Sequence, residues 1–221
     1  MISQIINKRD SFEIVRDKIA AILKTNIENQ HVLYVTEGLD PSPWDIRVFS
    51  ERNNPWEEFQ YSEGASAPIV NVWFDSSDLD DSGSSSVNDQ KTNATYNVDV
   101  YACGVSVETS EGHSSGDESS AIALHAAIRN VRNILMSGYY TYLDLRGVVW
   151  GRKVTSVNIF QPAADDATMQ NIIGARISFR VTFTETAPQV EGAPLELIAV
   201  QVKRAENGEI LLQMEYQDDG S

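Results

Sequence analysis

Cysteine, cationic side chains and long apolar runs are all scarce in this sequence. Cys103 is the only cysteine among the 221 residues, so the chain can form no internal disulfide. It lies in a segment where apolar and polar residues alternate, and no other possible metal ligand lies at a suitable spacing from it. We therefore expect Cys103 to be a small buried side chain. No run approaches the roughly 20 apolar residues of a membrane span, and Met1–Asp10 lacks the apolar core of a secretory signal. These absences predict a soluble protein, made in a reducing cytoplasm and without membrane contact.

Acidic residues clearly outnumber basic ones. The chain has 32 Asp and Glu against 17 Lys and Arg, which gives a net charge of −15 at pH 7. Nucleic-acid binding relies on clustered Lys and Arg that neutralise phosphates, and the sequence contains no such cluster. We therefore expect no specific DNA binding. An acidic surface can still let DNA slide past, because like charges repel the backbone.

Motifs for catalysis and metal binding are absent as well. The three histidines, His31, His113 and His125, are far apart in the sequence, and none has a zinc-binding spacing. The chain has no phosphate-binding glycine loop, no Gly-x-Ser-x-Gly elbow and no dinucleotide fingerprint. The sequence therefore predicts a protein that is not an enzyme, with no catalytic residue, cofactor or metal.

One acidic segment partly matches a calcium-binding loop. The residues at positions 1, 3, 5, 6 and 12 of such a loop are Asp78, Asp80, Ser82, Gly83 and Asp89. Position 12 should be a bidentate Glu, and the motif needs flanking helices where this chain has strand and loop patterns. Residues 76–92, rich in Ser, Asp and Asn, are instead expected to form an exposed polar insertion. Its exposed acidic residues would be Asp78, Asp80 and Asp81.

Two amphipathic helices are predicted from apolar residues at three- and four-residue spacing. The clearer one runs from about Asp117 to Met136, with Gly138 as a left-handed stop. Its apolar stripe is Leu124, Ala127, Ile128, Val131, Ile134 and Leu135. The other follows Asp10 and Glu13, which have capping-box spacing, and is expected to end at about Thr25 or Asn29. Its apolar stripe is Phe12, Val15, Ile19, Ile22 and Leu23.

Strands are predicted mainly where apolar and polar residues alternate. The predicted segments are His31–Thr36, Ile46–Ser50, Val70–Phe74, Ala94–Cys103, Lys153–Phe160 and Ile173–Phe183. In the last segment the polar face carries Arg176 and Arg180. Asp99 could be their cross-strand partner if the two central strands are neighbours, although an exposed pair contributes only about 0.2 to 1 kcal/mol.

A separate β-hairpin is predicted over residues 195–216, after a short linker that ends at Pro194. A two-residue turn at Asn207–Gly208 would set the apolar sides out of phase, whereas a three-residue loop, Glu206–Gly208, aligns them. The aligned register places on one face Ile198, Val200, Val202, Leu212, Met214 and Tyr216. A two-stranded ribbon is not stable alone, so we expect this face to be a subunit or partner interface.

The order of these elements resembles that of tail-terminator or tail-completion proteins of tailed bacteriophages. The resemblance rests on YNVDVYACG, residues 96–104, before a helix and on ARISFRVTFTET, residues 175–186, after it. It covers roughly residues 8–187, and the insertion and the hairpin exceed the smaller members. It implies an α/β (α+β) fold in residues 1–187, with two helices packed on one face of a mixed or antiparallel sheet.

The same resemblance implies a non-enzymatic virion protein, of which six copies form a ring between the tail tube and the head. The implied partners are further copies of itself, the tail tube protein and the head–tail connector or neck protein. DNA would pass through the ring without specific binding, and the ring would be assembled in the host cytoplasm. Two alternatives share the composition: a neck or head-completion protein, and a cytoplasmic assembly adaptor or chaperone. Ring formation separates the ring proteins from the adaptor.

Overall fold

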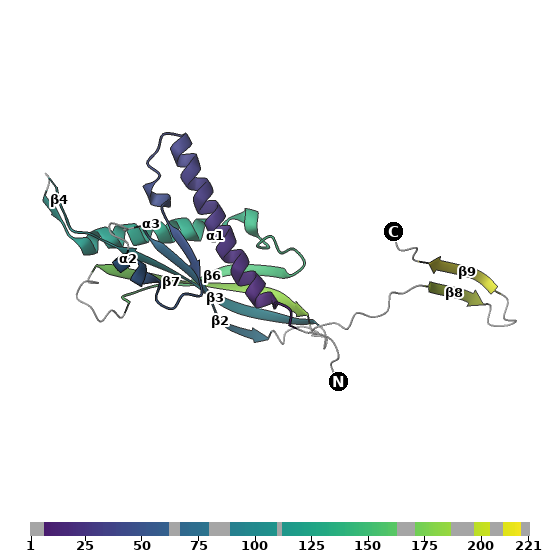
Figure 1. Cartoon of the computed structure of the whole chain (residues 1–221). Coiled ribbons are helices and arrows are strands. Elements are labelled where there is room, and N and C mark those ends of the chain that lie inside the picture. The colour runs from purple at the N-terminus through teal and green to yellow at the C-terminus, as the bar shows by residue number, and fades with distance from the viewer. Residues whose placement is uncertain are drawn as a thin grey trace. The chain divides into compact units, whose positions relative to one another are not determined.

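The computed structural model describes residues 7–61, 67–79, 89–109, 112–162 and 171–186, with two further strands at 197–203 and 210–217. The chain divides into two compact units: Ile6–Ala187, called the body below, and a second unit that holds the last two strands. The body is an α+β fold, in which a mixed five-stranded sheet carries two long helices (Figure 1). This confirms the predicted fold class.

The sheet has the strand order β1-β2-β3-β7-β6. Its members are β1 (Arg47–Ser50), β2 (Ile69–Leu79), β3 (Asp89–Cys103), β6 (Val149–Phe160) and β7 (Ile172–Thr186). The short β1 runs parallel to β2, and the other neighbours are antiparallel. The two strands with the clearest alternation, β3 and β7, are therefore paired in the middle of the sheet.

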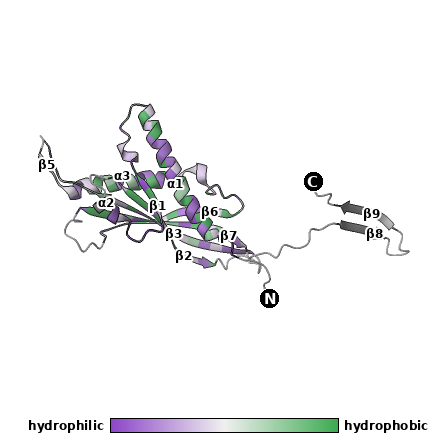
Figure 2. Cartoon of the chain, viewed as in Figure 1, coloured by the Kyte–Doolittle hydropathy of each residue, from purple (hydrophilic) through white to green (hydrophobic). Residues whose placement is uncertain are grey.

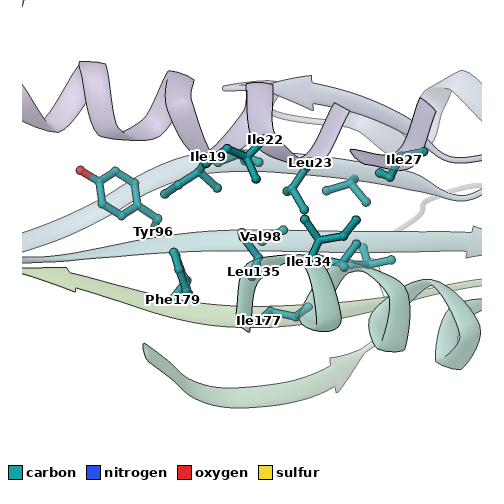
Figure 3. Packing of buried hydrophobic residues seen from close by; sticks show 14 of the residues in the cluster. Ile19, Ile22, Leu23, Ile27, Tyr96, Val98, Ile134, Leu135, Ile177 and Phe179 are labelled. Atoms are coloured by element: carbon teal, nitrogen blue, oxygen red, sulfur yellow. The ribbon is translucent and has the colours of Figure 1, made fainter. Parts of the chain in front are cut away.

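Two helices, α1 (Ser11–Thr36) and α3 (Gly116–Met136), cover one face of the sheet (Figure 3). The alternation of β3 and β7 supplies that face, because every second side chain points to the same side. Its fully buried members are Ala94, Tyr96, Val98, Val100, Ala102, Ala175, Ile177, Phe179, Val181 and Phe183. The predicted helix stripes pack against them, for example through Ile19, Leu23 and Leu135. The predicted core is thus confirmed.

Shorter elements connect the layers. The 3-10 helices are η1 (Ser42–Trp44), η2 (Pro55–Glu57) and η3 (Gly138–Tyr140), and α2 (Glu58–Tyr61) is a single helical turn. A small hairpin of β4 (Val107–Thr109) and β5 (Gly112–Ser114) precedes α3. The segment between β1 and β2 thus contains η2 and α2, and it adjoins the sheet face that the long helices leave free.

The first helix is longer than predicted. It continues through His31–Thr36, so the strand predicted there is wrong. The segment was predicted as a strand because it is rich in β-branched and apolar residues and has no polar side at helical spacing. The helix continues because no Gly or Pro interrupts it, and it ends where Gly38 adopts the left-handed conformation with φ 70°.

The end of α3 also differs from the prediction. Gly138 does not have a positive φ and begins η3, so it is not a left-handed stop. Arg152 of β6 instead donates to the carbonyls of Leu135, Ser137 and Tyr140, and it satisfies acceptors that the helix end leaves open. Burial lowers the pKa of Arg152, but a guanidinium stays charged in proteins and so suits the negative end of the helix dipole.

The second unit contains a hairpin of β8 (Leu197–Lys203) and β9 (Ile210–Gln217). Its antiparallel register pairs Ile198 with Tyr216, Val200 with Met214 and Val202 with Leu212. These are the pairs that the sequence predicts. The predicted loop, Glu206–Gly208, lies outside the described residues.

Candidate interaction surfaces

The hairpin residues predicted as an interface share one face of the ribbon. Ile198, Val200 and Val202 occupy alternate positions of β8 and pair directly with alternate positions of β9, and paired residues lie on the same side. The structure therefore brings all six predicted positions together.

The acidic insertion is only partly as predicted. Ser76–Leu79 and Asp89–Thr92 extend β2 and β3 as paired strand, with Asp78 opposite Asn93, so the loop prediction is wrong at both ends. The strands continue because Thr92 is buried against the sheet although its neighbours are polar. Asp78 is exposed on β2, while Asp80 and Asp81 lie outside the described residues. Within the described ranges, no three His, Cys, Asp or Glu side chains gather as a metal site would require.

The three histidines belong to three different elements. His31 lies on α1 with its Nε2 3.2 Å from Asp45 Oδ1, and His113 on β5 lies near Glu108. His125 is exposed on α3. Each is thus explained by a local surface contact or by exposure.

The sheet face without long helices contains an ion pair whose carboxylate is buried. Asp99 of β3 lies opposite Arg176 of β7, and its carboxylate accepts bonds from Arg176 Nε at 2.8 Å and Nη2 at 2.9 Å. Trp73 Nε1 at 2.9 Å and the Tyr101 hydroxyl at 3.3 Å donate to the same carboxylate. The predicted pairing is confirmed for Arg176, and the pair is half-buried rather than exposed, because the Asp99 side chain is only 3% exposed while that of Arg176 is 40% exposed.

Aromatic rings hold the arginine of this pair. The Arg176 guanidinium lies 4.8 Å from the Trp73 ring centre and 5.6 Å from that of Phe160. Its hydrogen bonds to Asp99 raise the pKa of Arg176, and burial, reinforced by the nearby Asp99 charge, raises the pKa of Tyr101. The charged arginine and the neutral phenol are therefore both stabilised.

A hollow of about 370 Å³ adjoins this pair, and we call it the open-face hollow. Its aromatic walls are Trp56, Trp73, Tyr101 and Phe160. The Asp99 carboxylate is unsuited to act as a general base there, because four donors already occupy its oxygens. The hollow suits the packing of a side chain rather than proton transfer.

The C-terminal end of α1 exposes four apolar side chains that we call the helix-end patch. They are between 52% and 62% exposed, and they are Val32, Leu33, Val35 and Leu39. The hydropathy colours of Figure 2 show hydrophobic segments toward this end of the helix. Exposed apolar residues that gather at one end of a helix are candidates for an interaction surface.

A groove of about 430 Å³ adjoins this patch, and we call it the α1 groove. Its lining includes Ile27 and Val32 of α1, Trp44 of η1, and Ile46, Arg47 and Ala67. Three donors of these side chains, Trp44 Nε1 and Arg47 Nε and Nη2, are buried and find no hydrogen-bond partner among the residues that the structure describes. The sequence did not reveal this groove, because its walls come from three separated segments and one of them was predicted as strand.

Exposed apolar residues also lie on β6, and we call the pair Val157 and Ile159 the β6 edge patch. They are 40% and 54% exposed and lie opposite Ile177 and Ala175 of β7, and β6 is an outermost strand of the sheet. An outermost strand presents unpaired backbone groups and is a common place for another chain to attach. Among the described residues, the helix-end patch and the β6 edge patch thus lie on different elements and differ in composition.

Comparison with known proteins adds no relative. A scan of protein-family models gives no match to the chain, and a search of curated proteins gives no significant match. None of the helices in the described part of the chain is long and apolar enough to span a membrane. What the protein does is therefore inferred from its fold, its surfaces and the resemblance of its elements.

Proposed function

We propose that the protein is a tail terminator of a tailed bacteriophage. Six copies form a ring that caps the tail tube and joins it to the head connector. The order of elements over residues 8–187 supports this, since the body combines the implied sheet with two helices on one face. In this role the protein is structural and not an enzyme.

The observation that carries the proposal is the presence of two unlike apolar surfaces on one body. The helix-end patch is built from α1, whereas the β6 edge patch is built from the far strand of the sheet. A two-fold dimer needs one surface that complements itself, while two different surfaces favour head-to-tail contacts. Repeated head-to-tail contacts close into a ring when the rotation between neighbours allows it.

The size of the patches indicates that the body needs a further contact. Completing the burial of a half-exposed Val, Leu or Ile yields about 1 kcal/mol, so the six side chains of the two patches supply roughly 6 kcal/mol. Association of two proteins costs about 4 to 15 kcal/mol in lost freedom of motion. Contact between bodies alone is therefore marginal.

The hairpin supplies the further contact in this proposal. Its six apolar positions would add roughly 6 to 12 kcal/mol on burial, at about 1 to 2 kcal/mol each. The hairpin belongs to a separate unit of the chain, and a two-stranded ribbon needs an external surface to cover its apolar face. We therefore assign it as an arm that docks on a neighbouring subunit.

The acidic charge fits a ring through which DNA passes. A net charge of −15 repels the phosphate backbone and opposes sticking. Partners in this proposal are the tail tube protein and the head–tail connector or neck protein, and the location is the tail or neck of the virion.

Immunogold electron microscopy of the virions that encode this chain tests the proposal. We expect the label at the head–tail junction, and on detached tails rather than on detached heads. A label that stays with the heads would instead identify a neck or head-completion protein. Complete absence from purified virions, with abundant protein in the lysate, would identify an assembly adaptor or chaperone.

A further inference from the structure

The α1 groove exposes acidic groups next to apolar walls. Glu28 is exposed, and the side chain of Asp45 is 54% exposed beside His31. Arg47 also lines the groove, but its Nε and Nη2 atoms are buried and its Nη1 atom faces Glu58 at 3.7 Å. The charge that a partner meets in this groove is therefore negative.

The surroundings of the groove add to this negative charge. Between residues 25 and 46 the chain contains Asp and Glu but no Lys or Arg. The last turn of α1 has no basic residue, although cations stabilise the negative end of a helix dipole. Glu28, Val32 and Val35 follow one another at four- and three-residue spacing, so one side of α1 joins the groove to the helix-end patch. A matching partner brings cations together with apolar surface.

Two neighbouring strands of the sheet carry cations that face each other. Lys153 of β6 lies directly opposite Arg180 of β7, and both side chains are exposed. Like charges directly opposite each other destabilise a sheet. Arg176 on the same face is held by Asp99, whereas in the described part of the chain no ion pair joins either opposed cation to a carboxylate. Acidic groups from a partner would relieve this repulsion.

Apolar surface accompanies these two cations. Trp150 Nε1 donates to Thr184 Oγ1 at 2.6 Å, and Thr184 shares a face of β7 with Arg180, four positions earlier. Trp150 is 58% exposed, and the β6 edge patch lies on the same strand. We call Trp150, Lys153 and Arg180 the cationic face. It combines the two features that the groove requires of a partner.

Within one body the groove and the cationic face point apart. The groove includes Arg47 of β1, and β1 and β6 are the two outermost strands of the sheet. The groove also uses α1, which covers one face of the sheet, whereas Arg180 alternates with the buried Phe179 and Val181 and so lies on the other face. The two surfaces therefore meet only between copies, as a head-to-tail contact requires.

We propose that the cationic face of one copy binds the α1 groove of the next copy, with Lys153 and Arg180 facing the two carboxylates of the groove. This inference rests on the head-to-tail contact of the proposed function and names the charges that orient it. Lysine and arginine suit the groove because their methylene stems pack on apolar walls such as Ile27 and Val32, while their charged ends reach the carboxylates.

Charge reversal in the full-length chain tests the contact by sedimentation equilibrium. One variant, Lys153→Glu with Arg180→Glu, makes the cationic face acidic. The other, Glu28→Lys with Asp45→Lys, makes the groove basic. Each variant alone brings like charges together, so we expect its dissociation constant for self-association to rise at least about tenfold. In an equal mixture, contacts between unlike copies join opposite charges again, and the dissociation constant should return to within about threefold of the wild-type value.

A matched control changes the same amount of charge elsewhere. Arg129→Glu with Arg132→Glu alters two exposed arginines of α3 that belong to neither surface, and it should leave the dissociation constant unchanged. Urea denaturation checks that each variant is folded. If the glutamates on the sheet prevent folding, Lys153→Gln with Arg180→Gln replaces them and should still weaken association about threefold.

The contact and the ring can fail separately. An unchanged dissociation constant in either reversed variant, a mixture that associates no better than its components, or a wild-type chain that does not associate would overturn the contact. A hexamer that is insensitive to these charges would overturn the contact and leave the ring intact. Association that follows the charges without reaching six protomers would support the contact and overturn the tail-terminator function.

Discussion

The two ends of α1 carry similar apolar residues in different surroundings. Toward the N-terminus, Val15, Ile19 and Leu23 are fully buried against the sheet. Toward the C-terminus, Val32, Leu33 and Val35 are more than half exposed. A partner from outside the body is the simplest reason for apolar residues to persist where the sheet no longer covers them.

This difference in burial also explains why the sequence predicted the N-terminal part of α1 correctly as helix and its C-terminal part wrongly as strand. The buried end has a helical period because one side contacts the sheet and the other contacts water. The exposed end lacks that period, which is typical of a segment covered on more than one side, and it was taken for a strand.

The largest expected effect is on stability, and it separates the two ends of the helix. Leu23→Ala should reduce the free energy of unfolding by about 2 to 5 kcal/mol, because it leaves a cavity in the core. Leu33→Ala should change it by no more than about 0.5 kcal/mol in a dilute monomer. Urea denaturation measures both. Similar losses for the two variants would show that the helix-end patch is part of the monomer's core.

Hydrogen exchange should show the same contrast along the backbone. In dilute monomer we expect amides of residues 32–35 to open at a free energy about 2 kcal/mol lower than those of residues 19–23, or about 30-fold more often. The difference should shrink in the assembled protein, since a neighbour then covers the patch. Equal protection along the whole helix in the monomer would contradict the account.

A smaller effect is expected from pH at the buried end. The Tyr96 hydroxyl donates to the Phe12 carbonyl at 3.0 Å, and burial raises the pKa of Tyr96 above its ordinary value. This contribution is therefore fully present below about pH 10, where the unfolded phenol titrates, and stability falls by about 1.4 kcal/mol per pH unit above it.

The variant Tyr96→Phe isolates this effect. It should be about 1 kcal/mol less stable than the parent at pH 8, and the difference should shrink or reverse above pH 10. Tyr139→Phe, at a side chain that is 83% exposed, is the control and should show neither change. A Tyr96→Phe difference that stays constant from pH 8 to pH 11 would argue against the buried phenol.

Much of the fold could be predicted because its central strands alternate clearly. The two faces of β3 and β7 followed from that alternation, and Asp99 could be expected opposite an arginine of β7 if the two strands were neighbours. The burial of that pair could not be predicted, because it depends on Trp73, Tyr101 and Phe160 closing around it. Alternation along a strand shows which of its side chains share a face. Burial on the sheet face without long helices depends in addition on residues from several elements.

Surfaces were harder to predict than the core. The hairpin register followed from its own alternation, whereas the α1 groove combines Ile27, Trp44 and Ala67 from separate segments. Segments this far apart leave no joint pattern in the sequence. The prediction of a polar loop at residues 76–92 failed at both ends for a different reason. The residues there have little apolar surface, yet they extend β2 and β3 because their backbones pair. The tail-terminator function stays a prediction.

Native mass spectrometry of the full-length protein tests the central claim most directly. We predict one dominant species with the mass of six protomers, and a shift to monomer in Leu33→Glu, where a charge enters the helix-end patch. Ile122→Glu is the matched control, because Ile122 is an exposed apolar residue on α3 outside both patches. It should leave the hexamer intact. A wild-type protein that stays monomeric, or a Leu33→Glu variant that still forms the hexamer, would contradict the account.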